Sequence, residues 1–231
     1  MSLYKHYSFD LWLTLIRSNP EYKKERVNFF FQHYNFKKKS REDVNHIIRQ
    51  IDLMCNAINE RTGKNIDAEE MYLMVISLVN ENSIPLKEIN IEEIAFQLEA
   101  LLFNYLPFVY CTETSGVLNH LKQKSNNSIS VLSNTGFIKG STLRKVLAEL
   151  DLACFFDFQI YSDEVGLSKP NKSLFELMIK TASVHRSDSL LLNDILHVGD
   201  NPEADITGAK AAGINSLLIN SNDVKIVELM K

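Results

Sequence analysis

Four short stretches of this chain combine carboxylates, hydroxyls and a lysine in an order that could do chemistry. The first is FDLWLTL, residues 9–15, in which Asp10 ends an apolar run and Thr14 follows four residues later. Between them stands Trp12, the one tryptophan among the 231 residues. The other three stretches contribute Ser133 and Asn134 from VLSNTG, Lys169 from GLSKP, and Asp200 and Asp205 from HVGDNPEAD.

These side chains suit the transfer of a phosphoryl group to an aspartate. A phosphoryl group is anionic, so its site needs a lysine and hydroxyl or amide donors. An aspartate that attacks such a group needs its own charge neutralised, which a divalent metal held by Asp10 and Asp200 would do. Mg²⁺ favours one or two carboxylates together with substrate oxygens and waters. Each stretch alone also fits a turn or a cap, but the four together predict a catalytic site.

The elements around these stretches alternate between strand and helix. Strands are predicted at 3–10, 129–132, 158–161, 195–198 and 216–219. Helices are predicted near 113–124, 141–150, 172–182 and 204–212, with a last one at the C-terminus. This alternation predicts an α/β fold, a doubly wound parallel sheet of Rossmann-like type. Ligands of such sheets bind beyond the carboxyl ends of the strands, where the polar stretches lie. His197 falls inside a strand, where we expect it to be packed.

The pattern between residues 19 and 107 is helical throughout. Four helices are predicted, and three of them open with a capping pair: Ser40 with Asp43, Asp67 with Glu70, and Asn90 with Glu93. This block interrupts the α/β pattern after its first strand. We therefore expect an α/β core from residues 1–18 and 108–231, with an inserted helical subdomain at 19–107.

The composition limits partners and location. The formal net charge of −4 argues against nucleic-acid binding by bulk charge. The sequence has no run of about twenty apolar residues that would span a membrane, and no signal peptide is apparent. The three cysteines, Cys55, Cys111 and Cys154, form no C-x-x-C and are expected to be buried thiols in a reducing compartment. We expect a soluble cytoplasmic protein, a monomer or homodimer, that binds a small anionic metabolite.

The motifs and their order resemble the haloacid dehalogenase-like superfamily of hydrolases, in the branch with a helical cap after the first motif. FDLWLTL resembles the first motif and VLSNTG the second. SDEVGLSKPNKSLFELMI is very similar to the third motif, and HVGDNPEADITGAKAAGI to the fourth. The resemblance covers nearly the whole chain. It implies that residues 19–107 are a cap that closes over the site and sets substrate choice.

The resemblance also implies a role for each matching residue. Asp10 would be the nucleophile that forms a covalent intermediate, and Lys169 would neutralise charge on nucleophile and substrate. Ser133 would hydrogen-bond the transferred group, together with backbone amides that follow it, from Asn134 onward. Thr14 would support the turn after the nucleophile.

The same resemblance implies a Mg²⁺ site. Asp10, Asp200 and the backbone carbonyl of Trp12 would hold the ion, and Asp205 would complete or orient its shell. Trp12 itself departs from the pattern, because the phosphatases of this family carry an aspartate there as general acid and base. An indole only donates a hydrogen bond. Loss of acid–base help costs about 10²–10⁴-fold in rate.

Three interpretations remain open. The first is a Mg²⁺-dependent hydrolase of a small phosphorylated or phosphonate-like compound, with a good leaving group or a proton from elsewhere; cations available from the helical block are Lys23, Lys24, Arg26 and Arg41. The second is a metal-independent 2-haloacid dehalogenase, since those relatives carry an aromatic residue at the position of Trp12 and halide leaves without a proton. The retained Asp200 and Asp205 argue against it. The third is a catalytically impaired member that binds a ligand or a partner.

Overall fold

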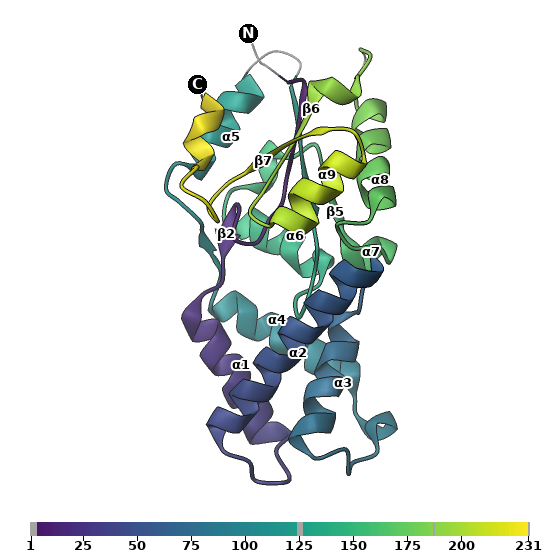
Figure 1. Cartoon of the computed structure of the whole chain (residues 1–231). Coiled ribbons are helices and arrows are strands. Elements are labelled where there is room, and N and C mark those ends of the chain that lie inside the picture. Colours follow the sequence, from purple (N-terminus) through teal and green to yellow (C-terminus); the bar gives the residue numbers. More distant parts are fainter. Residues whose placement is uncertain (1–3, 124–126, 187, 231) are drawn as a thin grey trace.

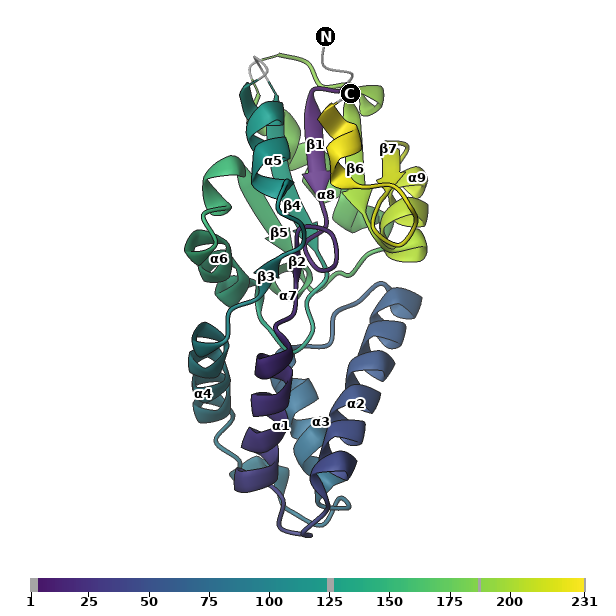
Figure 2. The ribbon, with the colours of Figure 1, turned by 90° about the vertical axis from the view of Figure 1, so that its left-hand side faces the viewer.

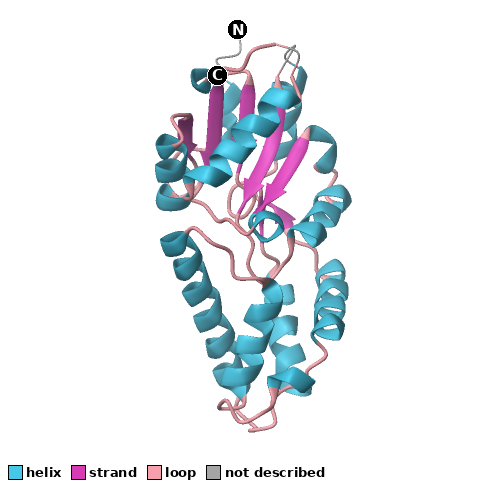
Figure 3. Ribbon diagram, turned by 90° about the vertical axis from the view of Figure 1, so that its right-hand side faces the viewer, coloured by secondary structure: helices cyan, strands magenta, loops and turns pink. Residues whose placement is uncertain are grey.

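The computed structural model describes residues 4–123, 127–186 and 188–230, and divides visibly into two parts. A sheet with helices around it forms one part, and four helices form the other (Figure 1). Strands of the sheet are confined to the first part (Figure 3). The predicted strand 3–10 and helix 113–124 each extend by one residue beyond the described residues.

The sheet has five parallel strands in the order β5-β4-β1-β6-β7. They are β5 (Phe158–Tyr161), β4 (Ser128–Ser133), β1 (His6–Phe9), β6 (Ile195–Gly199) and β7 (Asn215–Leu218). The first strand, β1, lies at the centre and pairs with β4 on one side and β6 on the other. An isolated strand is not stable, so β1 depends on these neighbours. In the register, Phe9 is opposite both Val131 and Val198, so β4 continues for two residues and β6 for one residue beyond the end of β1. The predicted parallel α/β fold is confirmed.

Helices cover both faces of the sheet, as parallel strands buried on both sides require. One face packs against α5 (Thr114–Gln123), α6 (Gly140–Glu149) and the 3₁₀ segment η5 (Ile226–Met230), and the other against α8 (Lys172–Val184) and α9 (Gly208–Ala211). Figure 2 shows α5 and α6 beside the strands. The predicted C-terminal helix is this short 3₁₀ turn, and the helix predicted at 204–212 is a π-helical turn, η4 (Pro202–Thr207), followed by α9.

The predicted helices of the 19–107 region are α1 (Pro20–His33), α2 (Arg41–Thr62), α3 (Ala68–Val79) and α4 (Ile91–Asn104). We call them the four-helix block. Capping boxes open α2 and α3, and the Asn90 side chain caps α4, as the sequence predicts. The block has its own apolar core, which includes Phe30, Ile48, Met71 and Val75.

Short connections join the block to the sheet. Two strands that the sequence did not reveal, β2 (Ile16–Arg17) and β3 (Phe108–Val109), pair antiparallel where the chain enters and leaves the block. Each has two residues, too few to show an alternating pattern. A one-turn helix, α7 (Ser162–Val165), was also not predicted.

Two further features of the described residues bear on the expectations from composition. No helix among them is long and apolar enough to cross a membrane. The expectation of three buried thiols is wrong for two of them, because Cys55 is buried but Cys111 is half-buried and Cys154 is exposed. Cys154 lies in the short 3₁₀ turn after α6, η2 (Ala153–Phe155), where the chain crosses the surface toward β5.

Candidate active site

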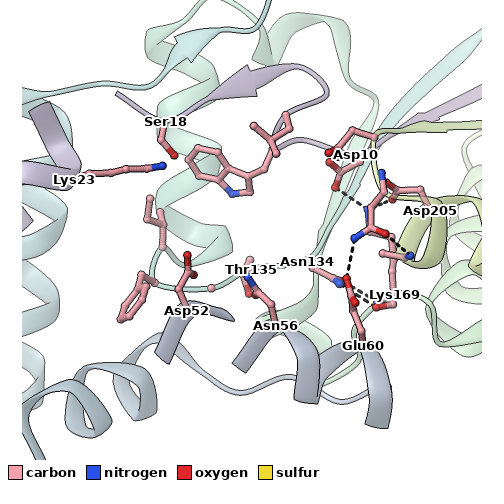
Figure 4. Close-up of a pocket in the computed structure, with 18 of the residues that line it drawn as sticks. Asp10, Ser18, Lys23, Asp52, Asn56, Glu60, Asn134, Thr135, Lys169 and Asp205 are labelled. Carbon is pink, nitrogen blue, oxygen red and sulfur yellow. Dashed lines mark hydrogen bonds and ion pairs between the residues drawn. The ribbon is translucent and has the colours of Figure 1, made fainter. Parts of the chain in front are cut away.

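The carboxyl ends of the three central strands bring the predicted side chains together. Asp10 follows β1, Asn134 follows β4, and Asp200 follows β6. Lys169 comes from the loop between α7 and α8 and reaches the same place (Figure 4). The three strands are buried at every position, so the sheet determines where these side chains leave the backbone.

Lys169 binds two carboxylates at once. Its Nζ donates to Asp10 Oδ1 at 2.7 Å and to Asp205 Oδ1 at 2.5 Å, and the side chain is 1% exposed. Burial alone would lower the pKa of Lys169, but the two carboxylates outweigh it and raise that pKa above its usual range. The lysine is therefore a fixed positive charge.

Asp205 is the most fully hydrogen-bonded carboxylate of the group. Besides Lys169, His197 Nε2 lies 3.1 Å from its Oδ1, and the Asn201 backbone N–H donates to its Oδ2 at 3.0 Å. Burial opposes ionisation, yet Lys169 and His197 hold the pKa of Asp205 below its usual range. Burial lowers the pKa of His197, so its neutral ring donates from Nε2 and accepts at Nδ1 from the Ser8 hydroxyl, 3.0 Å away.

Gly199 makes room for this carboxylate. A Cβ at that position would lie 2.2 Å from Asp205 Cγ, which no side-chain adjustment at Gly199 could relieve. The glycine at the end of β6 is thus required for the approach of Asp205 to Lys169.

Three carboxylates crowd together around this lysine. Ligand oxygens of Asp10, Asp200 and Asp205 all lie within 4.8 Å of one another. Burial raises the pKa of Asp10, with Lys169 opposing and Asp205 adding to the rise. Burial and the charges of Asp10 and Asp205 raise the pKa of Asp200 to about 7. One lysine does not balance three carboxylates, and hard oxygen donors in this number fit a hard divalent cation such as Mg²⁺.

A cavity of about 360 Å³ opens in front of these groups. The α/β part contributes Asp10, Trp12, Asn134, Lys169 and Asp200 to its lining. The four-helix block contributes Tyr22, Lys23, Arg26, Asp52, Asn56 and Glu60. Asp52, Asn56 and Glu60 stand four residues apart and so share one face of α2, which looks into the cavity (Figure 4).

Trp12 lies in a tight turn directly after β1. Leu13 beside it has φ of 58°, a left-handed conformation that is unusual for a leucine, and its N–H donates to Ile16 O at 2.7 Å. The turn places Trp12 in the wall of the cavity that Asp10 also lines.

Two predicted residues do not line the cavity. Ser133 is buried, and its hydroxyl donates to the backbone oxygen of Asn134 at 3.1 Å. Thr14 is also buried, and its Oγ1 has no hydrogen-bond partner in the described part of the chain. Asn134 does line the cavity, but its amide exchanges two hydrogen bonds with the backbone of Lys169, at 2.7 and 3.0 Å. It thereby holds the loop that carries the lysine.

The structure adds residues that the sequence did not reveal. His197, expected only to be packed, is buried and contacts Asp205. Asn201 donates from Nδ2 to Glu60 Oε1 at 2.8 Å, which joins the loop after β6 to α2. Of the four cations considered in the block, Lys23 and Arg26 line the cavity, whereas Lys24 pairs with Glu21 and Arg41 stacks on Phe31.

The chain is similar to a known family and to several known proteins. The family model described as haloacid dehalogenase-like hydrolase matches residues 4–213. Pyrimidine 5'-nucleotidase YjjG of Escherichia coli (strain K12) is 32% identical over 114 residues, which are 48% of this chain and 47% of that protein. Glyceraldehyde 3-phosphate phosphatase of Methanothermobacter thermautotrophicus is 34% identical over 110 residues, 47% and 43% of the two chains. The chain spans about half the length of the curated relatives it matches.

Solved structures share the fold over nearly the full length. A putative HAD-hydrolase, YfnB from Bacillus subtilis, solved bound to magnesium, has a TM-score of 0.70 at 19% identity and covers 96% of this chain and 91% of that one. A 2-haloacid dehalogenase from Pseudomonas syringae pv. Tomato has a TM-score of 0.65 at 17% identity, with 96% and 88% covered. At these identities the likeness concerns the fold alone.

Proposed function

The chain belongs to the haloacid dehalogenase-like hydrolase family, and on that premise we propose that it hydrolyses a small phosphorylated or phosphonate compound with the help of Mg²⁺. The observation that carries the proposal is the buried Asp10–Lys169–Asp205 group with Asp200 beside it, at the head of a cavity. The curated relatives named above are a nucleotidase and a phosphatase, which favours a phosphorylated substrate.

In this proposal Asp10 is the nucleophile. Its carboxylate attacks the phosphorus atom, the bond to the leaving oxygen breaks, and the phosphoryl group is carried on the aspartate until water releases it. Lys169 stays charged and lies 2.7 Å from Asp10, so it offsets negative charge on the nucleophile and on the incoming group. Thr135 and Gly136 line the cavity after β4. The Thr135 N–H donates to Ser162 Oγ at 2.8 Å, so the Gly136 N–H is the backbone donor we assign to the transferred group. Ser133 acts on that group only if its hydroxyl turns away from Asn134 O.

Asp10, Asp200 and the backbone carbonyl of Trp12 would hold the Mg²⁺ ion. When bound, the ion supplies the positive charge that three carboxylates and one lysine lack. Asp205 is engaged by Lys169, His197 and Asn201, so its role is to orient the lysine and the loop that carries Asp200.

The four-helix block acts as a cap in this proposal. Residues 1–18 and 108–231 then form the core, and residues 19–107 form the cap. Its helices α1 and α2 supply the wall of the cavity opposite Asp10, so they determine which leaving group fits. Asp52 and Asn56 lie there within reach of hydroxyl groups on a substrate.

Trp12 sets a limit on the reaction. It occupies the place beside the nucleophile where a carboxylate would protonate the leaving oxygen, and its N–H does not titrate. We therefore expect the enzyme to favour leaving groups that depart without a proton, such as an acyl phosphate over an alkyl phosphate.

The decisive experiment is a substrate panel with and without Mg²⁺. It contains alkyl phosphates, an acyl phosphate, phosphonoacetaldehyde and 2-haloacids, with Asp10→Asn as the inactive control. We expect Mg²⁺-dependent phosphate release that Asp10→Asn abolishes. Halide release without Mg²⁺ would instead identify a dehalogenase, for which the aromatic side chain of Trp12 in the cavity wall is the favouring observation. Measurable Mg²⁺ binding without turnover of any compound would support a ligand-binding role.

A paired variant tests the role of position 12. Trp12→Asp restores a carboxylate beside Asp10, and we expect it to raise the rate on alkyl phosphates by about 10²-fold, with a smaller effect on an acyl phosphate. Equal effects on both substrates would contradict the idea that a missing proton donor limits the wild-type enzyme.

A further inference from the structure

Two cations of the four-helix block face the cavity without a carboxylate partner. Lys23 and Arg26 are three residues apart on α1 and line the same cavity as Asp10. Within the described residues, no carboxylate lies within 4.0 Å of either one. The neighbouring Lys24, by contrast, pairs with Glu21 at 3.2 Å on the outer face of the helix. Figure 4 shows Lys23 extended toward the interior of the cavity, beside Ser18.

Arg26 is held in place by aromatic rings. Its guanidinium carbon lies 4.4 Å from the centre of the Phe137 ring and 5.7 Å from that of Tyr22. Phe137 is itself stacked on Tyr72 at 6.0 Å with an interplanar angle of 17°, and the Tyr72 hydroxyl donates to Phe137 O at 2.6 Å. A stacked arginine loses little freedom when it binds a ligand.

One donor of this arginine is unsatisfied. Arg26 Nε is buried and has no hydrogen-bond partner among the described residues. That nitrogen has almost no accessible surface, so an anion in the cavity would bind Arg26 where another part of its side chain lines the cavity. The planar fork of a guanidinium fits a carboxylate or phosphate oxygen pair.

We propose that Lys23 and Arg26 form a second anion subsite, which selects substrates whose leaving group carries its own carboxylate or phosphate. The inference rests on the proposed function, in which Asp10 and Lys169 receive the phosphoryl group that is cleaved. The cleaved group lies at the strand ends and the second anion lies against α1, on the other wall of the cavity. A cavity of about 360 Å³ suits a short metabolite that bridges the two.

Binding of phosphonates tests the subsite without any turnover. Calorimetry compares 3-phosphonopropionate, which has a carboxylate at its far end, with propylphosphonate, which has a methyl group there. We expect the first to bind at least about ten-fold more tightly to the wild-type protein. Lys23→Met and Arg26→Gln should remove most of this difference, and Lys24→Met should keep it. Lys23 is exposed and lies outside the apolar core, so its variant reports binding even where Arg26→Gln unfolds.

Turnover then distinguishes the two proposals and the two kinds of anion. The panel compares glycerol 3-phosphate with 3-phosphoglycerate and with glycerol 1,3-bisphosphate, which differ in the group at the far carbon. A higher kcat/KM for one or both anionic substrates, lost through KM in Lys23→Met, supports the subsite and identifies the anion. Equal phosphonate affinities, or a preference that Lys23→Met leaves intact, overturn it. A phosphonate preference with no turnover of any phosphate ester or acyl phosphate keeps the subsite and rejects the hydrolase.

Discussion

Lys169 supplies the positive charge that pairs with the buried carboxylates of Asp10 and Asp205. Lys169 is 1% exposed and lies between two buried carboxylates, so its removal would leave Asp10 and Asp205 as neighbouring negative charges with no counterion in the protein. Breaking a buried pair in this way is far more costly than losing a pair on the surface, because the remaining charge stays out of water. The contribution of Lys169 to the stability of the protein can therefore be measured independently of any reaction.

Lys169→Met should lower the free energy of unfolding by about 3–5 kcal/mol at neutral pH. Lys172→Met provides the matched control: that lysine pairs with Glu176 at 3.0 Å but is 58% exposed, and a surface pair contributes about 0–1 kcal/mol. Urea denaturation of both variants measures the difference. A loss in Lys169→Met no larger than that of the control would contradict the buried charge balance described above.

At the residue scale, the sequence predicts the site residues that a local pattern marks. Asp10, Lys169 and Asp200 each follow a strand or stand in a recognisable motif, and all three line the cavity. His197 could not be predicted as a partner of Asp205, because one histidine in an apolar strand gives no pattern beyond burial. The contact between Asn201 and Glu60 joins residues 141 apart, and only the folded position of α2 beside the loop after β6 creates it.

At the element scale, the predictable features are those encoded within a few residues. Capping side chains correctly locate the starts of α2, α3 and α4. The π-helical turn after β6 starts at Pro202, two residues before the predicted helix, because Asn201 accepts hydrogen bonds from two backbone N–H groups there. Strand β1 cannot be predicted in this way. Its four residues are all buried, and the ring nitrogens of His6 find their hydrogen-bond partners only on a neighbouring strand.

His6 makes the stability of the sheet depend on pH. Its ring nitrogens lie 2.7 Å from Ser128 Oγ and 3.0 Å from Ser130 Oγ, and burial lowers its pKa to about 3, with Asp157 opposing the shift. The folded protein thus keeps His6 neutral while the unfolded chain protonates it below its ordinary value of 6.5. This contribution to stability is complete above that value and is lost as the pH falls toward 3.

We expect His6 to account for about 2 kcal/mol of lost stability between about pH 7.5 and about pH 5. Denaturation of the wild type and of His6→Gln across this range measures it, because the amide keeps a donor and an acceptor but does not titrate. The variant should be less stable at neutral pH and should have the shallower slope. Identical slopes would show that His6 is not the group responsible, since His197 is present in both proteins.

At the scale of the whole molecule, the alternating pattern predicts the parallel sheet, and the long helical interruption predicts the four-helix block. The contacts between them are not predictable, because they join loops that are far apart in the sequence. The end of α2 is the clearest of these. Gly63 O accepts hydrogen bonds from Ser168 N at 3.1 Å and from Asn171 Nδ2 at 3.0 Å. The loop that carries Lys169 is therefore anchored to the block.

Asn65 is the residue in which several of these contacts meet. Its Oδ1 accepts the Ser162 hydroxyl at 2.7 Å, with the hydroxyls of Thr135 and Ser168 at 3.4 and 3.5 Å. These hydroxyls come from the segments after β4 and β5 and from the loop before Lys169. Asn65→Ala removes the shared acceptor, so we expect faster hydrogen exchange in residues 63–67 and 166–171 together, and a loss of about 1–3 kcal/mol of stability.

Lys64→Ala is the matched control, because the Lys64 side chain is exposed and its bridge to Leu167 uses the backbone. It should leave the exchange of both segments unchanged. If the four-helix block and the lysine loop are joined as described, Asn65→Ala must loosen both segments in parallel, since neither can hold its position without the other. Faster exchange confined to residues 63–67 would show that the loop keeps Lys169 in place by itself, and that the block contributes walls to the cavity without supporting the charged group at its head.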